Sequence, residues 1–209
     1  MIGIFGGTFD PVHLGHLRTA LDVFEALVLE ELRFIPLGQA VHRDQPLTSA
    51  QQRLALLRAA IEPQPGFVVD EREIRRQAPS YSVHTLEELR GELGMDASLC
   101  LLLGRDAFNV FHTWHQPERI LELAHLVVMD RPGHAPPQVP ELRALMQNRV
   151  VENVSALRQQ PAGRILFHAV TQLDISSSDI RQRLAQGRSI RWLVPEAVHR
   201  QLSPGRDTK

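Results

Sequence analysis

Short apolar runs alternate along this chain with stretches whose apolar residues have helical spacing, and this alternation most constrains the fold. The apolar runs cover 2–5, 32–36, 67–70, 98–104, 125–130 and 164–170. The helical spacing predicts helices over 15–29, about 49–61, 80–94, 117–124, 139–147, 175–187 and from 195 onward. Strands that alternate with helices form a parallel sheet covered on both faces. The prediction is an α/β, Rossmann-like doubly wound sheet with a small C-terminal helical part.

Local signals define the ends of several of these elements. Thr48 or Ser49 is the expected N-cap of the helix over 49–61. The helix over 80–94 is expected to have serine caps, early acidic residues and a glycine at its end. The segment GRDAFNVFHTW, from 104 to 114, is predicted to be a loop, and 138–163 has the weakest pattern of the chain.

The length and composition limit the class of protein. A chain of 209 residues and 23.6 kDa fits one domain over 1–209. A net charge of −1 gives no sign of nucleic-acid binding, and no apolar run reaches the ~18 residues of a membrane helix. A single cysteine, Cys100, excludes an intrachain disulfide. No signal peptide is evident, so we expect a cytoplasmic protein.

The opening stretch MIGIFGGTFDPVHLGH combines a strand, two glycines and two histidines before a helix. Gly6 and Gly7 are expected to end the strand and to let the backbone approach a ligand closely. His13 and His16 have three interpretations: turn residues, a metal pair, or donors to phosphate oxygens beside a helix N-terminus. Gly15, which removes a side chain between the histidines, favours the phosphate interpretation.

The stretch ISSSDIR is a second candidate for anion binding. One of Ser176, Ser177 and Ser178 suffices to cap the helix that follows. The other hydroxyls and Arg181 one turn later would suit a polyphosphate, because a guanidinium can bind phosphate through two hydrogen bonds.

GGTFDPVHLGH together with ISSSDIR resembles the H-x-G-H nucleotidylyltransferases. The segments APSYS…TL and LLLGRDAFNVFHTW are similar to the bacterial branch that adenylates nicotinate mononucleotide. The resemblance covers nearly the whole chain and implies that ATP and nicotinate mononucleotide give the deamido dinucleotide and pyrophosphate. It also implies Mg²⁺ carried by the ATP phosphates, with no metal-ligating protein residues. Residues 175–209 would complete the ATP site.

The resemblance implies three sets of site residues. The catalytic set is His13, His16 and Arg181. The residues expected to bind ATP are Gly6, Gly7, Thr8, Phe9, His16, Gly104, Asp106, Arg131, Ser176, Ser177, Ser178 and Arg181. The residues expected to bind nicotinate mononucleotide are His42, Arg43, Ser82, His84, Thr85, Trp114 and His115.

This chain departs from the pattern of that family at two places. The loop that usually reads Pro-Pro-His-Lys is AVHR here, so the charge persists at Arg43 without the two prolines. His115 follows Trp114 where many relatives have a second aromatic residue. Both departures lie in the part expected to contact the acceptor.

The acceptor can also be argued from the residues themselves. Trp114 offers a flat face for a pyridine ring, although a core tryptophan explains it equally well. Amides expected to be free near His84 and Thr85 would favour a carboxylate over a neutral amide, although plain capping explains this segment too.

This reaction requires no general base from the enzyme. A phosphate monoester is mostly dianionic at neutral pH, so its attack needs positioning and charge stabilisation rather than a general base. Three alternatives stay open: an H-x-G-H enzyme for another acceptor such as phosphopantetheine, a non-catalytic nucleotide-binding module, and a fragment related to aminoacyl-tRNA synthetases. The oligomeric state cannot be inferred from the sequence.

Overall fold

The computed structural model describes residues 1–40, 46–130 and 139–203. In this part of the chain seven parallel strands form one sheet in the order β3-β2-β1-β4-β5-β7-β6. The strands are β1 (Ile2–Gly7), β2 (Glu31–Pro36), β3 (Phe67–Val69), β4 (Leu99–Gly104), β5 (His125–Asp130), β6 (Val150–Val151) and β7 (Ile165–Ala169). The strand order reverses between β1 and β4, as the predicted doubly wound fold requires.

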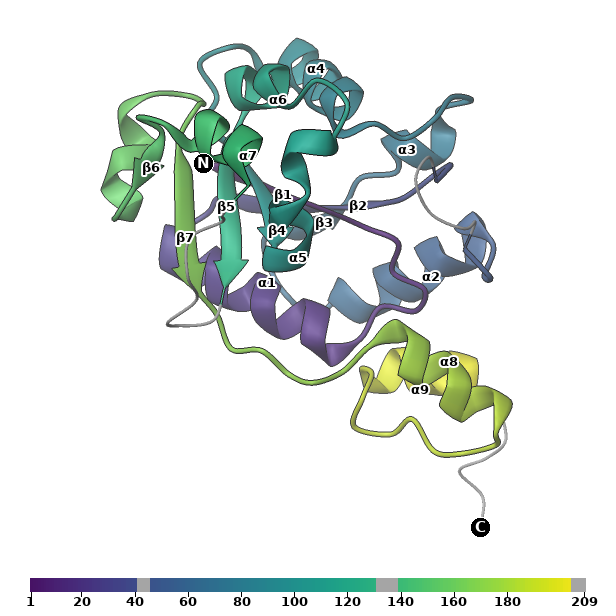
Figure 1. Ribbon diagram of the computed structural model, residues 1–209. Helices are drawn as coiled ribbons and strands as arrows, with labels where there is room; N and C mark the ends of the chain where they lie inside the picture. The colour runs from purple at the N-terminus through teal and green to yellow at the C-terminus, as the bar shows by residue number, and fades with distance from the viewer. Residues whose placement is uncertain (41–45, 131–138, 204–209) are drawn as a thin grey trace.

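Helices cover both faces of this sheet (Figure 1). They are α1 (Leu14–Leu27), α2 (Ala50–Ile61), α3 (Arg72–Arg75), α4 (Ser82–Leu93), α5 (Arg105–Asn109), α6 (Pro117–Leu123), α7 (Pro140–Met146), α8 (Ser177–Ala185) and α9 (Glu196–Leu202). Two 3₁₀ helices, η1 (Phe111–Thr113) and η2 (Val154–Gln159), complete the described elements. No helix among the described residues is long and apolar enough to cross a membrane.

The core lies in two layers because successive strand residues point to opposite faces. Phe5 of β1 packs with α1, α2, α8 and α9, whereas its neighbour Ile4 packs with α4, α5, α6 and α7. In β4, Cys100 belongs to the same core layer as Phe5, and Leu101 belongs to the same core layer as Ile4. Burial raises the pKa of the Cys100 thiol to about 12, so this thiol is an inert core group.

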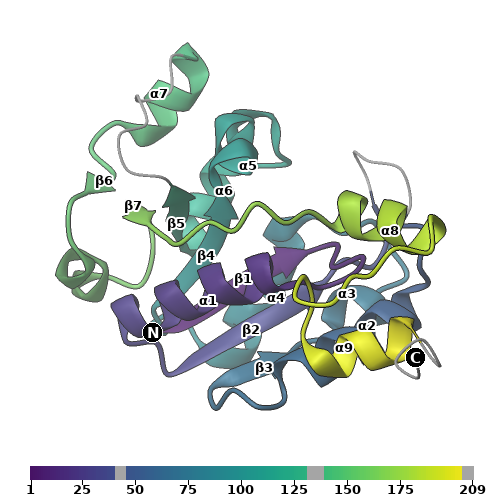
Figure 2. The same cartoon turned by 90° about the horizontal axis from the view of Figure 1, so that it is seen from below.

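The C-terminal helices lie far from the strand that precedes them. After β7 an extended segment passes α1 and leads to α8 and α9 (Figures 1 and 2). α9 packs against α2, and Leu193, just before it, accepts a hydrogen bond from the amide of Leu14 at 2.9 Å. This return brings α8 to the end of β1.

The structure corrects three local predictions. Gly6 and Gly7 do not interrupt β1 after Phe5: they pair with Ile35 and Pro36 of β2, and the strand ends only at Gly7. The predicted loop after β4 contains the short helix α5 and then η1. Pairing partners and packing from distant residues override the weak local preference in both places.

The third correction concerns the start of α4. Its N-cap is Tyr81, which makes no side-chain capping bond, and its first turn contains no acidic residue. The expected serine caps are therefore wrong here. Serine capping is confirmed at two other helices, since Ser49 caps α2 and Ser176 caps α8.

Residues 138–163, where the sequence pattern was weakest, hold α7, the short edge strand β6 and η2 in their described part. β6 pairs only through Val150 and Val151 with β7. Such short elements have too few residues to show a hydrophobic period.

Candidate active site

The segment from Thr8 to His13, called the β1 loop below, leaves the sheet at the point where the strand order reverses. Phe9 has a left-handed backbone, with a φ of 48°, and its ring is 1% exposed. A Cβ atom at Gly7 would lie 2.8 Å from that ring, so glycine is required there to admit Phe9. A Cβ at Gly6 would meet nothing within 4 Å, which leaves the strand end open on that side. The Phe9 ring therefore belongs to the core rather than to a ligand-facing surface.

His13 and His16 form one stacked pair at the start of α1. His13 is the N-cap residue, and its Nδ1 accepts a hydrogen bond from the His16 amide at 3.3 Å. The two ring centroids are 3.7 Å apart with an angle of 25° between the planes. Because Nδ1 of His13 accepts, the proton of the neutral ring sits on Nε2, where it can be donated.

Both histidines are neutral at pH 7. Burial lowers the pKa of His13 to about 4. Burial and the neighbouring His13 lower the pKa of His16 to about 3. Nδ1 of His16 is buried and has no hydrogen-bond partner among the described residues. A bound polyanion would raise both pKa values again, because negative charge favours the imidazolium form.

Gly15 keeps space for the His13 ring. A Cβ atom at Gly15 would lie 3.0 Å from both Cε1 and Nδ1 of His13, and 3.5 Å from the carbonyl oxygen of Ile175. The glycine between the histidines is thus a steric requirement of the pair, and it lies against the segment that leads into α8.

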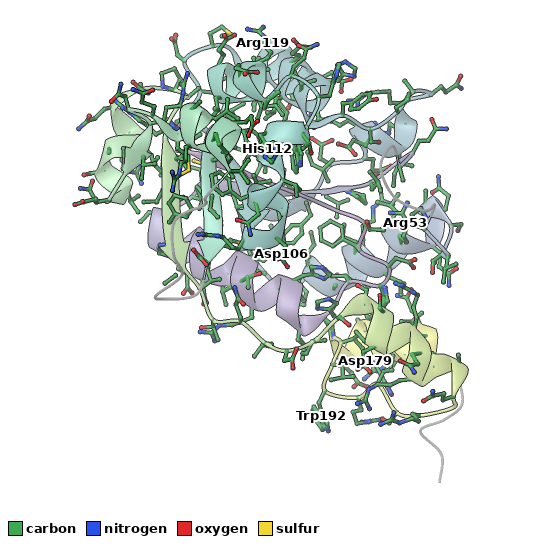
Figure 3. The ribbon with its side chains drawn as sticks, in the orientation of Figure 1. Arg53, Asp106, His112, Arg119, Asp179 and Trp192 are labelled. Atoms are coloured by element: carbon green, nitrogen blue, oxygen red, sulfur yellow. The ribbon has the colours of Figure 1, made fainter. Side chains whose placement is uncertain are left out.

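The start of α8 is bonded directly to the β1 loop, which passes between α2 and α8 (Figure 3). The Ser177 hydroxyl donates to the Pro11 carbonyl at 2.9 Å. Arg181 donates to the Asp10 carbonyl and, at 3.2 Å, to the Ser178 hydroxyl oxygen. The structure therefore brings the two anion-binding candidates together, although they are about 165 residues apart in the chain.

The three serines differ in what they can still donate. The hydroxyl oxygen of Ser176 accepts from the Asp179 amide, and that of Ser178 accepts from Arg181, so each of these hydroxyls retains its own proton. The Ser177 hydroxyl already donates its proton to the Pro11 carbonyl of the β1 loop. Ser176 and Ser178 are consequently better placed than Ser177 to donate to a phosphate.

A second group of predicted residues gathers where α4 begins. The rings of Tyr81 and His115 have centroids 4.5 Å apart, and His84 contacts both at 5.6 and 5.8 Å. Trp114 is half-buried, with its ring 5.5 Å from that of Phe111. The rings of Tyr81, His84 and His115 thus form one cluster at the start of α4.

The expected free amides near His84 and Thr85 are wrong. Both amides donate to the carbonyl of Tyr81, at 3.1 and 3.3 Å. The Thr85 hydroxyl is buried and donates to Glu73 at 2.8 Å, so this side chain is structural. Among the described residues, the amides left at this helix start are the earlier ones, those of Ser82 and Val83.

Other predicted site residues lie after β4 or outside the described residues. Gly104 is the N-cap of α5 and has open space at its Cβ position, and Asp106 is exposed in the first turn of that helix. Both follow the strand next to β1, on the edge that carries the β1 loop. His42, Arg43 and Arg131 lie outside the described residues.

Two buried charged residues, one within the β1 loop and one beside it, are absent from the predicted site residues. Asp10 is 3% exposed and Arg53 of α2 is 1% exposed. Burial lowers the pKa of Arg53, and the charge of Asp10 opposes this shift. Arg53 lies three, four and seven residues before Leu56, Leu57 and Ala60, so the helical period places it on the buried face of α2. This charged residue in an apolar stripe is the signal that could have found it.

The donors at this site suit a metal ion that arrives with phosphates. No group of three or more histidine, cysteine, aspartate or glutamate side chains that could hold a metal occurs among the described residues. Mg²⁺ keeps several waters and is commonly held by one or two carboxylates plus substrate phosphates. Neutral imidazoles at the start of α1 and hydroxyl protons at the start of α8 can donate to phosphate oxygens, so an ion that a nucleotide carries would suit this donor set.

Comparison with known proteins extends these observations. The cytidylyltransferase-like family model matches residues 4–183. A protein of Chromohalobacter salexigens named "Probable nicotinate-nucleotide adenylyltransferase" is 48% identical over 202 residues, covering 96% of this chain and 92% of its own length. A protein of Halorhodospira halophila with the same name is also 48% identical, again covering 96% and 92%.

Solved structures agree at the level of the fold. The nicotinic acid mononucleotide adenylyltransferase of Plasmodium falciparum, complexed with NaAD, superposes with a TM-score of 0.65 at 18% identity and covers 95% of this chain and 92% of its own. This likeness supports the Rossmann-like architecture. With 48% identity to curated relatives over nearly their full length, the chain belongs to the nicotinate-nucleotide adenylyltransferase family.

Proposed function

We propose that this chain transfers the adenylyl group of ATP to nicotinate mononucleotide, giving nicotinate adenine dinucleotide and pyrophosphate, a step of NAD biosynthesis. The family membership supports this activity. The observation in the structure that carries it is the stacked pair of neutral histidines bonded into the same corner as the serine–arginine start of α8. We also propose that the enzyme works in the cytoplasm.

The reaction is a direct displacement at the α-phosphorus of ATP. An oxygen of the acceptor phosphate forms a bond to that phosphorus, and the bond to the bridging oxygen of the β-phosphate breaks. Pyrophosphate leaves with the electron pair. The attacking phosphate is already mostly dianionic at neutral pH, so no side chain needs to accept a proton. Each neutral imidazole can donate one hydrogen bond, from His13 Nε2 and from His16, to the oxygens that gain charge.

The start of α8 is assigned to the departing pyrophosphate. Arg181 provides a positive charge beside the β1 loop, and Ser176 and Ser178 retain hydroxyl protons for donation. Mg²⁺, when bound with ATP, would neutralise part of the phosphate charge. Residues 175–209 accordingly complete the ATP site in this proposal.

The remaining contacts with the substrates are assigned from the residues that lie near the carboxyl ends of the strands. Gly104 and Asp106 are assigned to the nucleotide, because they follow the strand beside β1. Tyr81, His84 and His115 gather their rings at the start of α4 and are assigned to the pyridine ring of the acceptor. Trp114, which precedes His115 in the chain, is assigned with them. Ser82 remains a candidate for the acceptor carboxylate through its amide. His42, Arg43 and Arg131 stay predictions.

A pyrophosphate-release assay with ATP and Mg²⁺ tests the proposal. Nicotinate mononucleotide is expected to be preferred over nicotinamide mononucleotide, because helix amides favour a carboxylate. Equal rates would refute the carboxylate argument. Release only with phosphopantetheine would identify another acceptor, and release with none would indicate a non-catalytic module.

The role of the histidines is tested by His16→Ala. The variant is expected to keep its circular dichroism spectrum and to lose at least 100-fold in kcat, the scale typical of removing one preorganised donor. Activity within a few fold of the wild type would show that His16 does not contact the reacting phosphate.

A further inference from the structure

Arg53 joins three separate backbone segments next to the proposed phosphate corner. Its Nη1 donates to the Thr8 carbonyl at 2.7 Å, its Nη2 to the Leu37 carbonyl at 2.6 Å and its Nε to the Thr48 carbonyl at 3.3 Å. The side chain is 1% exposed, so water does not compete for these bonds. One guanidinium thus connects the β1 loop, the end of β2 and the start of α2 (Figure 3).

Asp10 completes this connection from the β1 loop. Its Oδ2 accepts from the amides of Leu47, at 3.0 Å, and Thr48, at 3.5 Å. Its main-chain carbonyl accepts from Arg181 of α8. The chain leaves the sheet at Leu37 and enters α2 after Thr48, and both points are held against the β1 loop.

These contacts connect the part of the chain assigned to ATP with the part assigned to the acceptor. The β1 loop carries the groups assigned to ATP. The segment beyond Leu37 bonds to the acceptor side, since the Gln39 amide donates to the Ser80 hydroxyl at 3.3 Å and the Gln39 carbonyl accepts from the Ser80 amide at 3.1 Å. Ser80 immediately precedes Tyr81, whose ring packs on His115.

We propose that Arg53 is a positioning residue for the transfer, which fixes the distance between the ATP corner and the acceptor side by holding the carbonyls of Thr8, Leu37 and Thr48. Arg53 is buried and donates its hydrogen bonds to backbone carbonyls, so it acts through the loops and is not a catalytic residue. This inference rests on the proposed adenylyl transfer. A lysine cannot replace it, because an ammonium lacks the planar fork that reaches three carbonyls in different directions.

The chain offers a matched control in Arg90 of α4. Arg90 is 5% exposed and donates only to backbone carbonyls, those of Leu123, Gly94, Met95, Ala97 and Pro161. These carbonyls precede β4, β5 and β7, at the amino ends of the strands, whereas the β1 loop lies at the carboxyl ends. Replacing Arg90 therefore removes a comparable buried clamp without touching the site.

The first test compares Arg53→Lys with Arg90→Lys in the full chain. Both variants are expected to lower the urea midpoint. Only Arg53→Lys is expected to lose at least 30-fold in kcat, with the KM for ATP changed by less than 3-fold, whereas kcat of Arg90→Lys stays within 2-fold of the wild type. Equal losses of kcat in the two variants, or a wild-type kcat in Arg53→Lys, would overturn the proposal. Should Arg53→Lys not fold, Arg53→Gln, which keeps a planar donor group, takes its place with the same criteria.

A second measurement does not depend on turnover. ATP alone is added, and hydrogen exchange is followed at the Leu47 and Thr48 amides. In the wild type and in Arg90→Lys, ATP is expected to slow this exchange at least 3-fold, because the β1 loop is tied to both residues. The same protection in Arg53→Lys would overturn the positioning role. If the wild type released no pyrophosphate, the proposed function would fail, and this exchange result would still decide the role of Arg53.

Discussion

Replacing Gly15 by alanine tests whether the histidine pair depends on the empty space between its rings. The added Cβ would lie 3.0 Å from Cε1 and Nδ1 of His13, tighter than an ordinary contact, and 3.5 Å from the Ile175 carbonyl. Both tight contacts are with the His13 side chain, so its ring is the group that must move, by a few tenths of an ångström. The ring is 6% exposed and stacks on His16 at 3.7 Å, so its movement also displaces its partner.

The magnitudes follow from two opposing effects. Alanine in place of glycine within a helix stabilises by roughly 0.5–1 kcal/mol, and crowding in a packed site costs about 1–3 kcal/mol. We expect the free energy of unfolding to fall by no more than about 2 kcal/mol. A misplacement of about 1 Å can cost roughly 100-fold in rate, so a shift of a few tenths of an ångström predicts a loss of about 4- to 10-fold in kcat.

The assay is pyrophosphate release at saturating ATP and nicotinate mononucleotide, together with urea unfolding. Gly91→Ala is the matched control, since Gly91 lies inside α4 and a Cβ there meets nothing within 4 Å. The control is expected to gain roughly 0.5–1 kcal/mol in stability with unchanged kcat. If Gly15→Ala kept the wild-type kcat, the placement of the His13 ring would not matter for the reaction, and the reasoning would be refuted.

Three further predictions concern stability and the roles of buried polar groups. Burial holds the pKa of His13 at about 4 and that of His16 at about 3, below the 6.5 of the unfolded chain. The unfolded form therefore takes up protons first as the pH falls below 6.5, and the fold should lose up to ~1.4 kcal/mol per pH unit for each histidine down to about pH 4. Urea midpoints at pH 7 and pH 5 should show a shallower loss in His16→Asn, and an unchanged loss would contradict the assignment. Thr85→Val removes a buried bond to Glu73 and should lower the free energy of unfolding by about 1–3 kcal/mol, measured by urea titration; a change of only a few tenths would show the bond to be unimportant. Ser177→Ala removes the bond to the β1 loop and should lower kcat by less than 10-fold, because its proton is already used; a far larger loss at unchanged stability would mean that this hydroxyl meets a phosphate.

Much of the fold could be predicted because its strands are apolar and its helices amphipathic. β4 and β5 are buried runs that show parallel strands directly, and α8 was predicted down to its serine cap. The strands and helices themselves place the loops after β1 and β4 at one edge, so the general location of the site follows from the alternation.

The errors in the predicted elements have separate causes. Gly6 and Gly7 belong to β1 because β2 supplies hydrogen-bond partners that no local signal announces. α5 was predicted as a loop, since five residues are too few for a hydrophobic period. At the start of α4, the amides of His84 and Thr85 are already used by Tyr81.

The sequence by itself determined the alternating architecture, the histidine pair with its glycine and the serine–arginine helix start, because these signals are periodic or local. Only the tertiary structure decided that α8 bonds to the β1 loop and that Arg53 connects three loops. Contacts between residues far apart in the chain depend on how the strands are ordered, and burial then sets the charge of His13 and His16. An arginine on an exposed face of α2 would make none of these three contacts, so it would have no part in positioning the loops.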